Sequence, residues 1–174
     1  MKRTSITLSL LSLGLTCASA IARAREVPIQ REALPVAVSA ALQTRYSDAE
    51  ILTLTQETEK GSILYEAEMT VAGRKIDALF DSNGTLREEE AEIPLVELPE
   101  SVRAAHARSA QAKWKVLTVE RVTSGNPATP VRFEMHVADG KRTLELQYSA
   151  NGKRLKATRA NEPDREASKA DRKS

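Results

Sequence analysis

The chain is poor in the residue types that most often carry covalent chemistry. It has one cysteine, two histidines and only 3% aromatic residues among 174. Cys17 lies in an N-terminal segment that we expect to be removed, so neither thiol catalysis nor disulfide bonding is expected in the mature protein. Neither His106 nor His136 lies in a nucleophile motif, and two distant histidines without cysteine are poor material for a zinc site. We therefore expect no catalysis, metal or cofactor, and we expect both histidines at the surface.

The N-terminus has the pattern of a secretory signal peptide. Lys2 and Arg3 precede an uncharged apolar run over residues 6–15, and Ala18-Ser19-Ala20 supplies the small residues that cleavage requires. We expect cleavage after Ala20, with residues 22–24 as an alternative cleavage site. The apolar run is short for a membrane span. The mature protein is therefore expected in the periplasm or outside the cell, with no span of the membrane.

The charge balance excludes one broad class of partner. The 26 basic residues less Lys2 and Arg3 leave 24, which equals the number of acidic residues. Nucleic-acid binding needs a concentrated basic surface, which a neutral mature chain does not indicate. No glycine-rich phosphate loop follows a strand and opens a helix, so nucleotide binding has no support either.

A pattern of residues occurs twice along the chain. The shared features are a Leu-Pro pair, a glycine after the first strand and an Asn-Gly pair, at Leu34-Pro35, Gly61 and Asn83-Gly84, then at Leu98-Pro99, Gly125 and Asn151-Gly152. The offset is 64 residues at the Leu-Pro pairs and 68 at the Asn-Gly pairs. Loops absorb insertions more readily than packed elements do, so this drift indicates a tandem duplication.

Each repeat shows a helical period followed by strand alternation. Pro35 and Pro99 suit the first turn of a helix, and the apolar residues after each one recur at helical spacing. The period then changes to two, as in a strand with one buried and one wet face. The expected strands cover residues 50–57, 63–71, 74–80 and 85–93, then 115–122, 131–137, 141–149 and 153–157. The two Asn-Gly pairs predict type I′ hairpin turns.

These elements predict an α+β fold of two tandem repeats. Each repeat is one helix followed by a four-stranded antiparallel meander, with the helices on one face of the sheet. The halves are expected to share one sheet or to pack on each other, since a repeat of this size is marginal alone. The expected divisions are a signal peptide over 1–20, a polar leader over 21–33, the repeats over 34–93 and 94–157, and a flexible charged tail over 158–174.

The uncovered sheet face is the best candidate for a binding surface. Its members are the polar alternates of the strands, namely Glu66, Glu68, Thr70, Asp77, Arg132, Glu134, His136, Glu145 and Gln147. Residues 88–90 with Glu92 predict an acidic strand, which either is a solvated sheet edge or meets a basic partner. Residues 81–84 begin like a calcium loop but lack the rest of its ligand series.

The chain resembles the PepSY-like family of exported proteins, which is related in fold to the β-lactamase inhibitory proteins. The resemblance rests on the following residues: Leu34, Pro35, Val38, Tyr65, Glu66, Glu68, Gly73, Lys75, Phe80, Asp81, Asn83 and Gly84, with Leu98, Pro99, Val102, Phe133, Glu134, Val137, Gly140, Lys141, Tyr148, Asn151 and Gly152 in the second copy. It covers about residues 34–157. It implies helices on one sheet face, an exposed opposite face, and no enzymatic activity.

Two functions remain open at this stage. The first is a protein-binding module that occludes a peptidase or a β-lactamase of the envelope through its open sheet face. The second is a periplasmic sensor that holds a small ligand or peptide between helices and sheet. The first predicts a filled core and an open polar face, and the second predicts an apolar pocket with a few polar groups.

Overall fold

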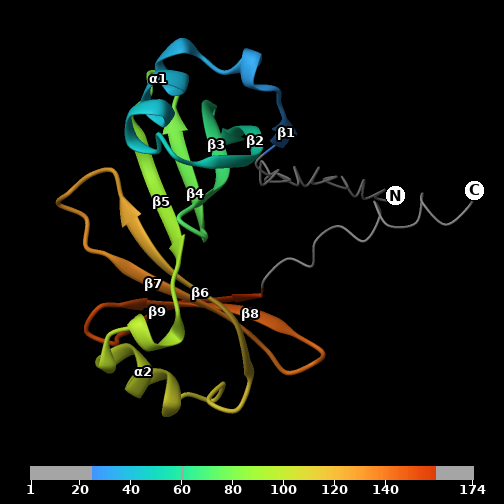
Figure 1. Ribbon diagram of the computed structural model, residues 1–174. Helices are drawn as coiled ribbons and strands as arrows, with labels where there is room; N and C mark the ends of the chain where they lie inside the picture. Colours follow the sequence, from blue (N-terminus) through green and yellow to red (C-terminus); the bar gives the residue numbers. More distant parts are fainter. Residues whose placement is uncertain (1–24, 60, 160–174) are drawn as a thin grey trace, which may run out of the picture.

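The computed structural model describes residues 25–59 and 61–159, which form one antiparallel sheet and two α-helices (Figure 1). The nine strands of this part of the chain are ordered in the sheet as they are in the sequence. They are β1 Arg25–Pro28, β2 Glu50–Glu59, β3 Ser62–Val71, β4 Arg74–Asp81, β5 Leu86–Glu92, β6 Lys115–Ser124, β7 Arg132–Ala138, β8 Thr143–Ser149 and β9 Arg154–Arg159. The helices are α1 Val36–Arg45 and α2 Glu100–Ala107, each preceded by a short 3₁₀ turn at Arg31–Ala33 or Leu95–Glu97.

The two halves have the same order of elements. Helix α1 is followed by β2 to β5, and α2 is followed by β6 to β9. Figure 1 shows the helices at opposite ends of the molecule, with the sheet running between them. Each helix begins directly after a proline, Pro35 or Pro99, whose carbonyl accepts the first helical hydrogen bonds.

Both helices cover the same face of the sheet. A row of direct cross-strand partners from β3 to β8 reads Met69, Ile76, Ala91, Arg121, Phe133 and Tyr148. The first of these residues lies in the core under α1, with Val38, Leu42 and Phe80. The last two lie in the core under α2, with Val102. One face therefore carries both cores, and no described helix covers the opposite face.

The expectation that His106 lies at the surface was wrong. His106 is 9% exposed and lies one turn after the fully buried Val102, on the face that packs against the second core. Burial lowers the pKa of its imidazole, because the charged form loses hydration. The prediction was wrong because alanines make up most of the apolar face of this helix, so the sequence did not show where that face ends.

The acidic strand lies in the middle of the sheet, so the expectation of a sheet edge was wrong. Residues Glu88 to Glu92 of β5 pair with Ser124 to Glu120 of β6, and β4 lies on the other side of β5. This pairing joins the two halves into one continuous sheet. The strands at the edges of the described sheet are β1 and β9.

The ends of the described chain differ from the expected divisions. Residues 25–28 of the expected polar leader form β1, which pairs with β2 and extends the sheet. This strand was missed because four residues are too few to show an alternation. Strand β9 continues to Arg159, into the expected tail. The expected signal peptide and the rest of the tail lie outside the described residues, and no described helix is long and apolar enough to cross a membrane.

The Asn-Gly turns have a different geometry from the one predicted. Only the glycine of each pair has positive φ, +82° at Gly84 and +84° at Gly152, whereas a type I′ turn needs positive φ at both central residues. A type I turn followed by a left-handed glycine accounts for the bond from each glycine N–H to the carbonyl three residues earlier. A Cβ atom would lie 2.5 Å from the Ala37 carbonyl oxygen at Gly84 and 2.4 Å from that of Ser101 at Gly152. In both halves, this turn thus contacts the first turn of the helix.

Candidate functional site

The face opposite the helices carries a broad group of carboxylates, which we call the acidic face. Cross-strand register and alternation place at least the following acidic residues on it: Glu57, Glu66, Glu68, Asp77, Glu88, Glu90, Glu92, Glu120, Glu134 and Glu145. One row of partners reads Glu68, Asp77, Glu90, Val122 and Arg132, and the next reads Glu92, Glu120, Glu134 and Gln147. The acidic face therefore crosses the β5–β6 junction between the two halves.

All nine residues expected on the open face lie on this side of the sheet, but Glu134, which was expected to be exposed, is buried. Glu66, Glu68 and Thr70 come from β3, Asp77 from β4, Arg132, Glu134 and His136 from β7, and Glu145 and Gln147 from β8. Sequence reasoning missed the face residues of the strands between them, Glu88, Glu90, Glu92 and Glu120. The sequence did predict an acidic strand at residues 88–92. Its position in the sheet depends on the pairing between the two halves, which no local pattern reveals.

Few cations balance these carboxylates. The Arg132 Nη2 atom lies 2.9 Å from the Glu88 Oε2 atom and 4.0 Å from the Glu134 Oε1 atom. The His136 Nε2 atom lies 3.7 Å from the Glu120 Oε2 atom. Among the described residues, the other nine carboxylates apart from Glu57 have no further side-chain ion pair, and Glu57 has interactions of its own. The face thus holds an excess of negative charge.

Burial and mutual repulsion raise the pKa values of several of these groups. The pKa is raised to about 7 for Glu66, about 8 for Glu90 and about 7 for Glu134, and in each case burial is the main cause. Neighbouring carboxylates add to the shift, led by Glu57 for Glu66 and by Glu134 for Glu90. Burial also raises the pKa of Asp77. A cation close to this face would oppose these shifts, because it favours the ionised form.

The acidic face is hollowed in the first half of the sheet. A cavity of about 110 Å³ is lined by Leu79 and by five acidic residues, Glu57, Glu66, Asp77, Glu88 and Glu90. A larger cavity of about 360 Å³ lies on the other side of the sheet, between the end of α1 and the start of β2. Its lining mixes apolar residues such as Leu42 and Ile51 with polar ones such as Arg31 and Gln43.

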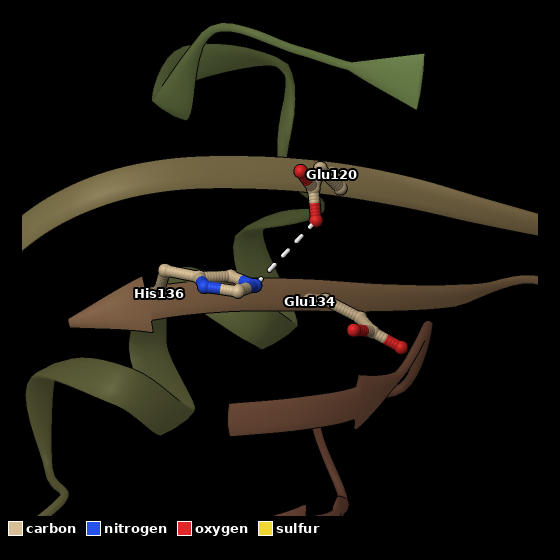
Figure 2. Close-up of side chains that lie close together, drawn as sticks. All are labelled: Glu120, Glu134 and His136. Carbon is tan, nitrogen blue, oxygen red and sulfur yellow. Dashed lines mark ion pairs between the residues drawn. The ribbon is translucent and has the colours of Figure 1, made fainter. Parts of the chain in front are cut away.

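One group of side chains on the acidic face combines carboxylates with an imidazole. Glu120 of β6 and Glu134 and His136 of β7 each place one ligand atom within 4.8 Å of the others (Figure 2). The other histidine, His106, lies among the α2 contacts on the opposite face. The sequence argument against zinc counted only histidines and cysteines, so it did not consider a mixed set.

Comparisons with known proteins identify relatives of the same architecture. A family model described as "Putative beta-lactamase-inhibitor-like, PepSY-like" matches residues 20–88 and again residues 63–156. Two solved structures show the fold. A Bacteroides eggerthii protein, described provisionally as periplasmic, has 20% identity and a TM-score of 0.64 over 72% of this chain and 88% of that one. A BLIP-like protein from Bacteroides fragilis has 25% identity and a TM-score of 0.56 over 74% and 88%. A search of curated proteins found no match.

Proposed function

The chain belongs to the PepSY-like family, and from its acidic face we propose that it is a non-catalytic binding module of the cell envelope or the secreted space. In this proposal the acidic face docks onto a basic surface of another exported protein. The provisional periplasmic description of the Bacteroides eggerthii protein supports this location. Binding on this face leaves the helices and both cores undisturbed.

The observation that carries the proposal is the half-buried, poorly balanced charge of the acidic face. At Glu66 and Glu90 an ionised carboxylate loses hydration without gaining an ion pair with a described residue, which is unfavourable in the free protein. Lysine and arginine side chains of a partner would supply the missing charges, and the hollow beside Glu66 and Glu90 has room for the end of one such side chain. A specific interface of ordinary size covers about 800 Å² on each partner.

We further propose that the partner is a peptidase or a β-lactamase, inhibited by steric occlusion. The family description and the BLIP-like protein from Bacteroides fragilis support this choice. An inhibitor of this kind needs no catalytic group, because it only has to cover the substrate cleft of its partner.

The test compares charge reversals on the acidic face with charge reversals outside it. The double variant Glu66→Lys with Glu90→Lys reverses charge on the acidic face, and Glu32→Lys with Glu100→Lys makes the same change at exposed positions outside it. Each protein is assayed for inhibition and binding against a panel of purified serine peptidases and β-lactamases with basic surfaces. We expect binding by the wild type and the control pair, and a loss of at least about 100-fold for the acidic-face pair.

Two results would contradict the proposal. One is equal loss of binding by the control pair, which would place the interface elsewhere. The other is an affinity that does not fall with added salt, since an interface between opposite charges weakens as salt screens them.

The cavity beside α1 favours a second candidate, the ligand sensor. Leu42, Tyr46 and Ile51 supply an apolar wall, and Arg31 supplies a cation at its rim. A screen of short peptides and small anions by thermal shift, repeated with Arg31→Ala, separates the two functions. Stabilisation that depends on Arg31 would support the sensor, and the acidic-face variants would not affect it.

A further inference from the structure

We propose that Glu120, Glu134 and His136 bind a divalent transition-metal ion, for which Zn²⁺ fits the donor set best. This site would extend the function of the acidic face beyond protein docking and does not depend on the identity of any partner. Two carboxylates and one imidazole are common zinc ligands, and three protein ligands leave one coordination position open. That position faces the uncovered side of the sheet.

The three ligands come from adjacent paired strands. Glu120 is the direct cross-strand partner of Glu134, so their side chains stand next to each other on one face. His136 is two residues after Glu134 on β7, so alternation places it on the same face. Figure 2 shows the imidazole directed at the Glu120 carboxylate, whereas the Glu134 side chain extends to the side away from the imidazole. The backbone positions of all three are held by the hydrogen bonds of the β6–β7 ladder.

The distances require only a small closure around an ion. The three ligand atoms lie within 4.8 Å of one another. Zinc bonds of about 2.1 Å in tetrahedral geometry place ligand atoms roughly 3.4 Å apart. Changes in the side-chain torsions of the two glutamates can close this difference, because both carboxylates are at the ends of flexible stems. The backbone does not have to move.

The environment of Glu134 is a second, independent reason to expect a cation. Its side chain is 6% exposed, and no described residue donates a hydrogen bond to it. Arg132 approaches it only to 4.0 Å, and the same guanidinium nitrogen lies 2.9 Å from Glu88. A buried carboxylate with so little compensation is strongly unfavourable. A metal ion bound between Glu134, Glu120 and His136 would supply the charge that the protein does not.

The choice of a transition metal follows from the imidazole. Calcium takes six to eight oxygen ligands, and magnesium keeps several waters and prefers oxygen, so neither uses a nitrogen donor well. Imidazole with carboxylate suits zinc and neighbouring transition metals. The acidic face elsewhere offers carboxylates without a histidine, so a site that depends on His136 would distinguish a transition metal from a loosely held calcium ion.

The first half of the chain supplies an internal control. The pairing of Thr55 with Glu66 on β2 and β3 corresponds to that of Glu120 with Glu134, and Glu68 then corresponds to His136. These equivalent positions lack a histidine and one of the two paired carboxylates. The strand geometry is the same, so the first half should not bind the ion.

The experiment titrates metal-stripped mature protein with zinc chloride, measured by calorimetry and equilibrium dialysis. We expect one ion per chain and a loss of affinity of at least about tenfold for His136→Ala and for Glu120→Gln. Glu68→Ala, the equivalent change in the first half, should leave affinity and stoichiometry unchanged. Cobalt chloride gives a second readout, because visible absorption of four-coordinate Co²⁺ should appear with the wild type and disappear with His136→Ala.

Circular dichroism first establishes that each variant is folded, and His136→Gln replaces His136→Ala if the latter is not. The proposal is overturned if the wild type takes up no stoichiometric zinc at micromolar concentration. It is equally overturned if folded His136 variants bind zinc like the wild type, or if 1 mM calcium chloride displaces the ion.

Discussion

In the first half of the sheet the polar face carries carboxylates, threonines and Lys75, whereas in the second half Arg132 and His136 lie among its carboxylates. The backbone underneath is alike. A register shift interrupts the first strand after each helix, at Ile51/Thr53 and at Val116/Thr118, 65 residues apart. Cross-strand partners one strand later are 68 residues apart, as in Glu66 and Glu134. The added residues lie in the β6–β7 loop. The similar backbone thus fixes the positions of the polar side chains in both halves, whereas the types of side chain at these positions differ.

The largest expected change in the free energy of unfolding comes from destabilising one core. The measurement asks whether the other core unfolds together with it. Phe80 is fully buried under α1, and Phe80→Ala should lower the free energy of unfolding by about 3–5 kcal/mol. Trp114, the one tryptophan, packs against the other core, under α2. Because the sheet is continuous through β5 and β6, urea unfolding followed by Trp114 fluorescence should show the full loss. An unchanged Trp114 midpoint would mean that the halves unfold separately.

The next effect tests whether the two turns are equivalent. Gly84→Ala and Gly152→Ala each place a Cβ against a helix carbonyl and impose a left-handed backbone on alanine. Each should lower the free energy of unfolding by about 2 kcal/mol, by the same mechanism. Thermal unfolding of the two single variants provides the measurement. A loss at one turn without a loss at the other would show that the two contacts differ in energy.

Transplanting the metal ligands would sharpen the comparison. Thr55→Glu combined with Glu68→His gives the first half the same three side chains as the second. We expect this double variant to bind a second zinc ion per chain. The affinity of the first half for zinc should be at least about tenfold higher in the variant than in the wild type. Thr55→Gln with Glu68→His is the matched control, since it lacks the second carboxylate. Equal zinc uptake by both double variants would contradict the assigned geometry.

The smallest expected change in the free energy of unfolding concerns the ionisation of Glu66 in the first half. The pKa of Glu66 is raised to about 7 by burial and by nearby carboxylates, from an ordinary value of 4.5. The folded state then holds the proton more tightly than the unfolded state, so stability falls as pH rises from about 4.5 to about 7. Glu66→Gln should remove this loss, which we put at about 1 kcal/mol after allowing for solvent screening.

Urea titrations of the Glu66→Gln variant and the wild type at pH 4.5 and pH 8 measure this effect. The variant should be the more stable protein at pH 8 and should match the wild type at pH 4.5. Glu68→Gln is the control, because this exposed neighbour lies on the same strand. If the wild type instead gained stability relative to Glu66→Gln between pH 4.5 and pH 8, the assigned direction of the pH dependence would be wrong.

Local patterns predicted the elements because they depend on neighbours in sequence. A few neighbouring residues are enough to show the alternation in β3 and β7 and the prolines before the helices. The side of the sheet on which Glu66 or His136 lies follows from this alternation. The β5–β6 pairing, and with it the positions of Glu90 and Glu120, depends on contacts between halves. The burial of His106 depends on how α2 rests on the second core. Neither of these leaves a local trace in the sequence.

The contact between Gly84 and Ala37 joins residues near the two ends of the first half, and the contact between Gly152 and Ser101 does so in the second half. A helix in this arrangement cannot complete its contacts until the turn between the last two strands of its own half has formed. A chain that folds from its N-terminus would therefore hold the helix with its contacts incomplete until the turn at Gly84 or Gly152 has been made. During that interval the apolar side of the helix would be open to chaperones and proteases.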